Sequence, residues 1–148
     1  MQRVAGILIA LLIVAYVAAI FIPFAPDEQR PGTRLAGELV DAAEVDWSFM
    51  TEQTKIWVET KTWYFIPHSV TTVSWVTDGE LYVPCGYCDS KRWPKNVDRD
   101  PDVRLKIGDK LYERRAVRIT DPGEARPLLH ASGLHDMDGI AVFRTDPR

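Results

Sequence analysis

Residues 80–120 constrain the fold of this chain more than any other stretch. In residues 80–83 apolar positions alternate and end at Pro84, which is typical of a half-buried strand stopped by a residue that cannot donate to a strand ladder. A cysteine-containing loop comes next, and residues 91–97 are expected to form a short helix. Ser90 is its predicted cap, because a serine hydroxyl can accept one of the unpaired amide protons in the first turn.

Glycine-containing turns join the neighbouring alternating segments into hairpins. Asp78-Gly79 gives the strongest hairpin signal of the chain, and Gly108-Asp109 is a second usable two-residue turn. Alternation predicts strands at residues 45–49, 56–58, 70–77, 80–83, 103–107, 111–119 and 139–145. Helical spacing and terminal signals predict further short helices at residues 34–44 and 122–132. Many short strands without βαβ alternation predict a mainly β fold with short helices, either a closed antiparallel barrel or a sandwich.

The N-terminal part of the chain contains nineteen consecutive residues without a charge, from Val4 at one end to Ile22 at the other. A helix of this length rises about 1.5 Å per residue and matches the roughly 30 Å hydrocarbon layer of a bilayer. We interpret it as a single-pass membrane anchor. A cleaved signal peptide is the alternative, but the apolar run is long for one and no clear small-x-small cleavage site comes after it. Residues 1–25 are the predicted anchor, and the proline-rich residues 26–32 are a linker.

Charge gives limited information on topology and partners. Basic residues flank both ends of the apolar run, so the charge bias does not decide the orientation. A span this close to the N-terminus typically directs the rest of the chain outward, which favours an extracytoplasmic, periplasmic domain. The formal net charge of −3, with both signs interspersed, gives no indication of nucleic-acid binding.

Cys85 and Cys88 form a C-x-x-C pair with several possible roles. Two thiolates at this spacing can form a reactive dithiol or half of a tetrahedral metal site. The thioredoxin context is missing because the pair comes after a hairpin strand, and the absence of a second cysteine pair argues against a structural metal. A structural disulfide outside the cytoplasm is the favoured interpretation, with buried unpaired thiols as the other main alternative.

Three other groups of residues carry candidate chemistry. The aromatic residues Trp57, Trp63, Tyr64, Phe65 and Trp75 could line a pocket for a flat ligand, although barrel core or an interface explains them better. Residues 135–138, His-Asp-Met-Asp, could hold a cation, but bracketing glycines favour a solvated loop. The basic residues Lys91, Arg92 and Lys95 on one short helix could receive a phosphate, or form an ordinary solvated face.

Three segments in the second half share a pattern with a known family. Residues 93–97 read WPKNV, residues 100–108 read DPDVRLKIG, and residues 116–122 read AVRITDP. Together they resemble the split β-barrel flavin- and deazaflavin-binding proteins, which include pyridoxamine-phosphate-oxidase-like and deazaflavin-dependent nitroreductase-like members. The resemblance implies a six-stranded split barrel over residues 33–148. It also implies a flavin or deazaflavin cleft near the end of the strand that begins after Gly79, with Cys85, Gly86, Lys91, Arg92, Trp93 and Asn96 as candidate cofactor-binding residues.

The chain departs from this family pattern where a phosphate is expected. Relatives that bind a phosphorylated cofactor carry a glycine- and arginine-rich turn, whereas residues 61–69 here keep only Lys61 as a positive charge. The favoured hypothesis is therefore a membrane-anchored accessory or binding protein with a degenerate cofactor site, working with a membrane-protein partner or as a homodimer. In that case residues 63–67 should fill or cover the cleft. The alternative is a membrane-tethered flavin- or deazaflavin-dependent oxidoreductase that reduces a quinone-like or nitro acceptor.

Overall fold

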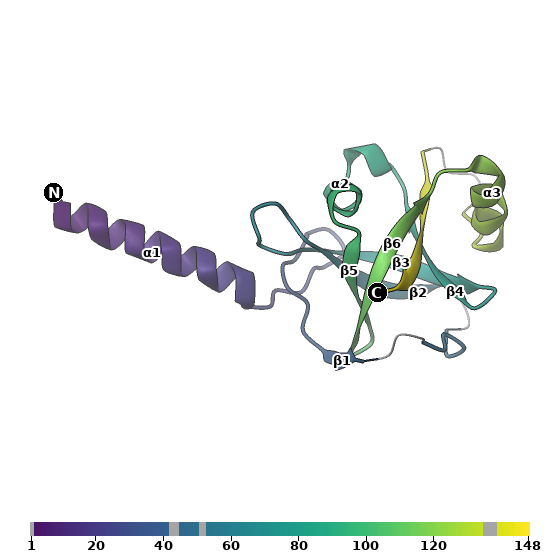
Figure 1. Cartoon of the computed structure of the whole chain (residues 1–148), viewed down its shortest axis with the longest axis horizontal. Helices are drawn as coiled ribbons and strands as arrows, with labels where there is room; N and C mark the ends of the chain where they lie inside the picture. The colour runs from purple at the N-terminus through teal and green to yellow at the C-terminus, as the bar shows by residue number, and fades with distance from the viewer. Residues whose placement is uncertain (1, 42–44, 51–52, 135–138) are drawn as a thin grey trace.

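The computed structural model describes residues 2–41, 45–50, 53–134 and 139–148, which form a long N-terminal helix and a β-barrel with short helices outside it (Figure 1). The elements are α1 (Gln2–Phe21), β1 (Glu38–Val40), β2 (Thr54–Thr60), β3 (His68–Thr77), β4 (Glu80–Cys85), the 3₁₀ turn η1 (Cys88–Ser90), α2 (Arg92–Arg99), β5 (Asp102–Ile107), β6 (Lys110–Ile119), α3 (Pro122–Ala131) and β7 (Ala141–Pro147).

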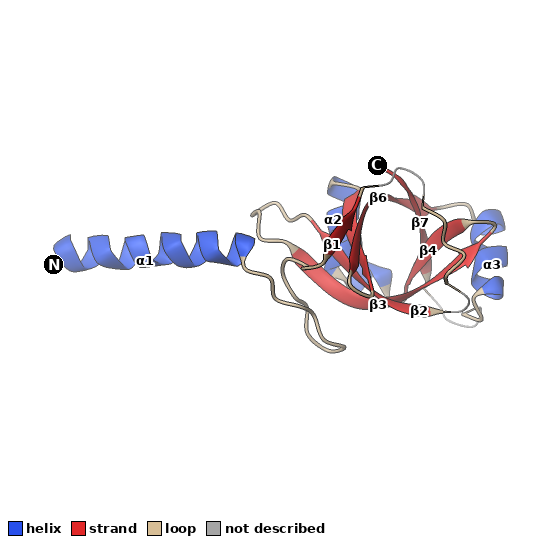
Figure 2. Ribbon diagram, turned by 90° about the horizontal axis from the view of Figure 1, so that it is seen from below, coloured by secondary structure: helices blue, strands red, loops and turns tan. Residues whose placement is uncertain are grey.

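Six strands close into an antiparallel barrel. They have the order β6-β5-β2-β3-β4-β7, every neighbouring pair is antiparallel, and a further pairing between β6 and β7 closes the ring. Strand β1 adds to the outside of β6 as a short parallel strand. Figure 2 shows α2 and α3 outside the ring and α1 projecting away from it. The predicted six-stranded antiparallel barrel with short helices is confirmed.

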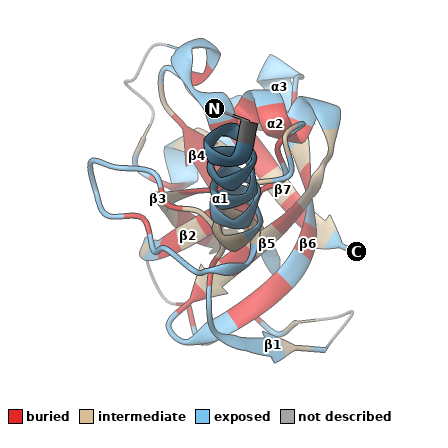
Figure 3. Ribbon diagram, turned by 90° about the vertical axis from the view of Figure 1, so that its left-hand side faces the viewer, coloured by how far each residue is buried: buried red, intermediate tan, exposed pale blue. Residues whose placement is uncertain are grey.

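The barrel has two hydrophobic cores because its strands alternate between two faces. The interior is filled by buried apolar side chains from five of the six barrel strands, among them Ile56, Leu81, Leu105 and Phe143, while β3 contributes the partly buried Val70 and Val76. A smaller core forms on the outer face, where Trp75, Tyr82, Ile119 and Val142 pack against the apolar residues of α3 and the turn after it. Viewed along α1, the buried segments lie on the barrel strands and on α2, whereas α1 is mostly exposed (Figure 3).

The predicted helix at residues 34–44 is wrong for the residues that the structure describes. Instead of a helix, Glu38–Val40 pairs in parallel with β6, and the Glu38 amide donates to the Asp109 carbonyl at 2.9 Å. The chain passes the β5–β6 turn so closely that a Cβ at Gly37 would lie 2.5 Å from the Asp109 carbonyl oxygen. Helical spacing is a weak signal, and here pairing with a sheet edge overrides it.

The predicted strand at residues 45–49 is also wrong, although Trp47 is buried as part of the core. A turn forms there, with a 2.8 Å bond from the Met50 amide to the Trp47 carbonyl. Trp47 packs on Tyr112 with ring centroids 5.1 Å apart, and the Arg114 guanidinium lies over its ring. The tryptophan therefore belongs to the packing inside the barrel rather than to a strand. The predicted Ser90 cap is wrong as well, because its hydroxyl donates to the Tyr87 carbonyl.

Helix α1 meets the requirements for a membrane span by length and composition. Residues Arg3–Phe21 have a mean hydropathy of 2.9, and none of this window is buried against the rest of the chain. A helix with these properties near an N-terminus is suited to be a membrane anchor or a signal sequence.

Residues 22–34, which we call the connecting segment, tie α1 to the barrel. Gly32 and Ser69 exchange two backbone hydrogen bonds, with nitrogen–oxygen distances of 2.8 and 3.1 Å. The Thr33 amide donates to the Phe24 carbonyl at 2.8 Å, so the segment is also closed on itself. The predicted linker lies within this segment and is attached to β3 at Gly32.

Replacing Gly32 with alanine is expected to loosen this attachment. A Cβ there would lie 2.5 Å from the Pro26 nitrogen, closer still to the Phe24 carbonyl oxygen, and 2.7 Å from the Ser69 hydroxyl. We expect Gly32→Ala to lower the free energy of unfolding by about 1–3 kcal/mol, as overpacking does elsewhere. Urea unfolding of the detergent-solubilised full chain, monitored by near-UV circular dichroism, measures this.

Gly6→Ala is the matched control, because a Cβ at Gly6 would meet nothing within 4 Å. If both variants unfold at the same urea concentration as the unmodified chain, the connecting segment does not need glycine at its contact with β3.

Candidate functional site

A cavity of about 450 Å³ lies between the connecting segment, β3 and the start of α2. Ligand pockets usually have volumes of about 300–1,000 Å³, so the space suits a small molecule or a group on a larger partner. Its lining residues are Asp27, Glu28, Gln29, Arg30, Pro31, His68, Val70, Thr71, Thr72, Lys91, Arg92 and Trp93. One wall is thus formed by residues that come shortly after the apolar helix.

Helix α2 places two cations at the rim because its apolar side is fixed in the barrel. Trp93 and Val97 are buried in the main core, and the Trp93 ring packs on Phe143 at a centroid distance of 4.8 Å. Lys91 occupies the N-cap position without a side-chain capping bond, Arg92 is the first residue of the helix, and both are exposed. Burial of one side of α2 therefore leaves its basic N-terminal residues on the cavity side.

The opposite wall is a tight turn organised by Asp27. The Asp27 carboxylate accepts hydrogen bonds from the backbone amides of Gln29 and Arg30, at 2.8 and 2.6 Å. The Thr71 hydroxyl of β3 donates to the Asp27 carbonyl at 2.9 Å. Glu28 pairs with Lys55 at 3.4 Å. The acidic side chains of this wall therefore have partners within the protein.

The basic side chains of the cavity form no ion pairs with the described carboxylates. Within the described part of the chain, none of the ion pairs involves Arg30, Lys91 or Arg92. Arg92 instead donates to the Tyr64 hydroxyl at 3.3 Å. The cavity is thus lined by three cations that have no carboxylate partner among the described residues. The site therefore favours an anionic group.

His68 adds a neutral polar group to this cavity. Burial lowers the pKa of its imidazole, and the nearby Arg92 charge lowers the pKa further. The side chain therefore stays uncharged at neutral pH, when it can both donate and accept a hydrogen bond.

The six predicted cofactor-binding residues are only partly brought together. Lys91, Arg92 and Trp93 line the cavity, whereas Cys85, Gly86 and Asn96 do not. Asn96 is buried, donates to the Thr60 hydroxyl at 2.9 Å and accepts from Arg99 at 2.9 Å. Its amide thus connects α2 to the barrel and is not directed to a ligand.

Cys85 and Cys88 are free thiols buried in the main core. Burial raises the pKa of Cys85, and a hydrogen bond between the two thiols raises it further. Burial also raises the pKa of Cys88. Thiols in this state are poor nucleophiles, and their pairing as a disulfide stays a prediction. Among the described residues, no group of three His, Cys, Asp or Glu side chains is placed to hold a metal ion. The predicted cation candidate at residues 135–138 lies outside them.

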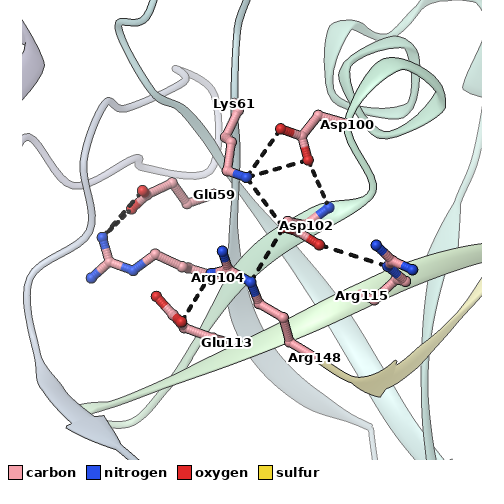
Figure 4. A network of polar contacts seen from close by, with 8 residues as sticks. All are labelled: Glu59, Lys61, Asp100, Asp102, Arg104, Glu113, Arg115 and Arg148. Atoms are coloured by element: carbon pink, nitrogen blue, oxygen red, sulfur yellow. Dashed lines mark hydrogen bonds and ion pairs between the residues drawn. The ribbon is translucent and has the colours of Figure 1, made fainter.

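Lys61, the one cation in the segment where relatives bind a phosphate, is engaged by carboxylates (Figure 4). Its ammonium group lies 3.0 Å from Asp100 and 3.3 Å from Asp102. Asp102 also contacts Arg148 at 3.2 Å and Arg115 at 3.7 Å. The network joins the end of β2 to β5, β6 and the chain end, so Lys61 has a structural role. In the same view, a separate ion pair joins Arg104 to a β2 carboxylate at 3.2 Å.

The loop between β2 and β3 neither fills nor covers the cavity, so this part of the favoured hypothesis is wrong. Trp63 and Phe65 are 73% and 74% exposed and lie outside the cavity lining. The cavity is bounded by the connecting segment instead. Of the other candidate aromatic residues, Trp75 is buried in the outer core, stacked on Tyr82.

Sequence reasoning missed the connecting segment and His68 as parts of the site. Proline-rich composition indicated a linker but carries no information about which residues the linker contacts. The Pro31-Gly32 step was the available signal, because a glycine next to a proline often marks a close approach of backbones.

Comparison with known proteins supports the fold. No protein-family model and no curated protein matches the chain. Solved structures do match. A candidate pyridoxamine 5'-phosphate oxidase from Listeria innocua is 19% identical, with a TM-score of 0.52 over 64% of this chain and 84% of that one. General Stress Protein 26 from Bacillus anthracis is 17% identical, with a TM-score of 0.52 over 69% and 85% of the two chains.

A third structure, a protein of unknown function from Agrobacterium tumefaciens, is 16% identical. Its TM-score is 0.54, and the match covers 64% of this chain and 48% of that one. At these identities the likeness concerns the fold. The chain therefore has the split β-barrel fold of the pyridoxamine-phosphate-oxidase-like proteins, as the sequence resemblance implied.

The residues at the place that the resemblance implies do not give a flavin ring an exposed flat surface, although Lys91 and Arg92 line the cavity and could contact its phosphate. A flavin needs a flat surface for its ring system and charge-assisted partners for its phosphate. The aromatic side chains of the cavity, Trp93 and His68, are both buried, and Lys61 is engaged by two carboxylates. The end of β4 belongs to the packed core.

The lowered pKa of His68 predicts a pH-dependent stability. Above its ordinary pKa of 6.5 the imidazole is neutral in both the folded and unfolded states. Below that pH the unfolded state binds the proton more readily, so the free energy of unfolding should fall as pH drops from about 7 to about 5. His68→Gln should remove this part of the pH dependence in urea unfolding. His130→Gln, at an exposed position in α3, should keep it, and identical slopes for all three proteins would contradict the assignment.

Asn96 is expected to act through stability. Asn96→Ala leaves the buried Thr60 hydroxyl without its donor, which should lower the free energy of unfolding by about 1–3 kcal/mol. Lys95→Ala, at the exposed neighbouring position, should change the stability by no more than about 0.5 kcal/mol. Thermal unfolding of the full chain in detergent measures both. An Asn96→Ala variant as stable as the unmodified chain would show that the amide is not a structural connection.

Proposed function

We propose that this chain is a membrane-anchored split-barrel accessory protein that binds an anionic group of a membrane-protein partner. The observation that carries the proposal is the cavity walled by the connecting segment, because this segment directly continues the apolar helix. A binding site built in this way stays close to the membrane surface. An accessory subunit that docks on a neighbouring membrane protein needs this placement.

Charge supports an anionic occupant. Arg30, Lys91 and Arg92 line the cavity without carboxylate partners among the described residues, whereas Asp27 and Glu28 are engaged within the protein. Binding a carboxylate or phosphate would give the three cations charge-assisted hydrogen bonds, which are about twice as strong as neutral ones. An acidic segment of the partner, exposed on the extracytoplasmic side, has the matching chemistry.

The state of the residues around the implied cofactor cleft supports a binding role over catalysis. Asn96 and Lys61 are occupied by contacts within the barrel, and Cys85 is buried with a raised pKa. These side chains offer no nucleophile or base with an orienting partner. The alternative, a membrane-tethered flavin- or deazaflavin-dependent reductase for a quinone-like or nitro acceptor, requires a ring site that the cavity does not offer.

Charge reversal at the cavity rim tests the proposal. We expect the full chain, purified from its native membrane in mild detergent, to co-elute stoichiometrically with one membrane protein. Lys91→Glu combined with Arg92→Glu should reduce this co-elution about tenfold or more, because reversing two charges replaces attraction to an anionic group by repulsion, and a tenfold change corresponds to about 1.4 kcal/mol.

Lys95→Glu is the matched control, since Lys95 lies on the same helix, is exposed and does not line the cavity. Co-elution that survives the double reversal would place the docking surface elsewhere. If the unmodified chain elutes alone, the result would contradict the proposed accessory role.

A further inference from the structure

We propose that the β2–β3 loop, residues 61–67, inserts its aromatic tip into the lipid interface beside α1 and gives the protein a second membrane contact. This inference rests on the proposed membrane anchoring of α1. Figure 1 shows the loop leaving the barrel on the side where α1 ends. The occupant of this surface is the lipid bilayer itself.

A hydrogen bond fixes the depth of the loop relative to the helix. The Tyr16 hydroxyl of α1 donates to the Tyr64 carbonyl at the loop tip. Tyr16 lies five residues before the last residue of α1, Phe21. At about 1.5 Å per residue, that is roughly 8 Å along the helix axis from its end. If α1 spans the bilayer, the loop tip therefore lies at the level of the last turns of the span.

The tip has the residue types that favour this level. Trp63 and Phe65 are 73% and 74% exposed, and their neighbour Tyr64 is partly buried. Tryptophan and tyrosine are enriched at the membrane–water interface, because one end of the ring system is apolar and the other is polar. The nearby chain exit is apolar as well, with Phe21 and Phe24 both exposed. The loop and the helix end thus both present apolar side chains on the side of the membrane.

The loop is built to hold this arrangement. The Thr62 hydroxyl donates to the Ile66 carbonyl at 2.7 Å, and the Phe65 amide donates to the Thr62 carbonyl at 3.2 Å. Phe65 has a φ of 65°, a left-handed conformation that is uncommon for an aromatic residue. The closed turn keeps Trp63 and Phe65 directed outward rather than allowing them to fold back onto the barrel.

The loop also connects to the cavity. Arg92 at the cavity rim donates to the Tyr64 hydroxyl at 3.3 Å. Two contacts with the bilayer, through α1 and through the loop, would fix the orientation of the barrel. The cavity rim at Arg92 would then face the membrane surface, where a membrane-protein partner presents its exposed segments.

Tryptophan quenching by brominated lipids tests the inference. The full-length protein is reconstituted into phosphatidylcholine vesicles with bromine on the acyl chain close to the headgroup. Residues 1–46 contain no tryptophan, so the helix itself contributes no signal. We expect clear quenching in the unmodified protein and loss of most of it in Trp63→Phe. Trp57→Phe, a substitution in β2, should keep the quenching.

Vesicle flotation of the same samples separates the two proposals. If the chain does not float with the vesicles, the result contradicts both the membrane anchoring and the loop insertion. A chain that floats while Trp63→Phe retains the full quenching overturns the loop insertion alone.

Discussion

The paired backbone hydrogen bonds between Gly32 and Ser69 are the constraint on which the arrangement of this protein depends. They attach the chain to β3 ten residues after the apolar run ends, and the Thr33 hydroxyl contacts the Ile22 carbonyl at 3.3 Å. Further back along the helix, Tyr16 bonds to the β2–β3 loop. The helix and the barrel are therefore joined at two places, and the segment between them forms a wall of the cavity.

The barrel interior is filled by side chains, so a ligand can bind only on the outside of the fold. Phe143, Ile56, Leu81 and Leu105 are fully buried within it, and Trp47 packs into the same core. A ligand must therefore use a surface feature, and the cavity between the connecting segment, β3 and α2 offers cations that no described carboxylate engages. These cations come from segments that are distant in sequence and meet because the connecting segment is attached to β3.

Amphipathic strands and specific turns predicted a closed barrel or a sandwich, and the family resemblance selected the six-stranded split barrel. Asp78 and Gly79 both have positive φ, as a two-residue hairpin requires, and the strands on either side were located correctly. Prediction failed where tertiary contacts decide the structure. Residues 38–40 pair with a sheet edge, and Trp47 is buried without strand geometry. The cavity was predicted in part. Lys91 and Arg92 were identified from the predicted helix, whereas the positions of Arg30 and His68 in the cavity depend on the contact between the connecting segment and β3, which no local pattern encodes.

We propose that this split barrel binds a membrane partner and holds no flavin. The most direct measurement is the absorption spectrum of the full chain, purified in detergent from its native membrane, together with the supernatant after denaturation. We expect a colourless protein that also fails to retain added flavin mononucleotide or deazaflavin. A stoichiometric flavin or deazaflavin band, released on denaturation, would contradict it.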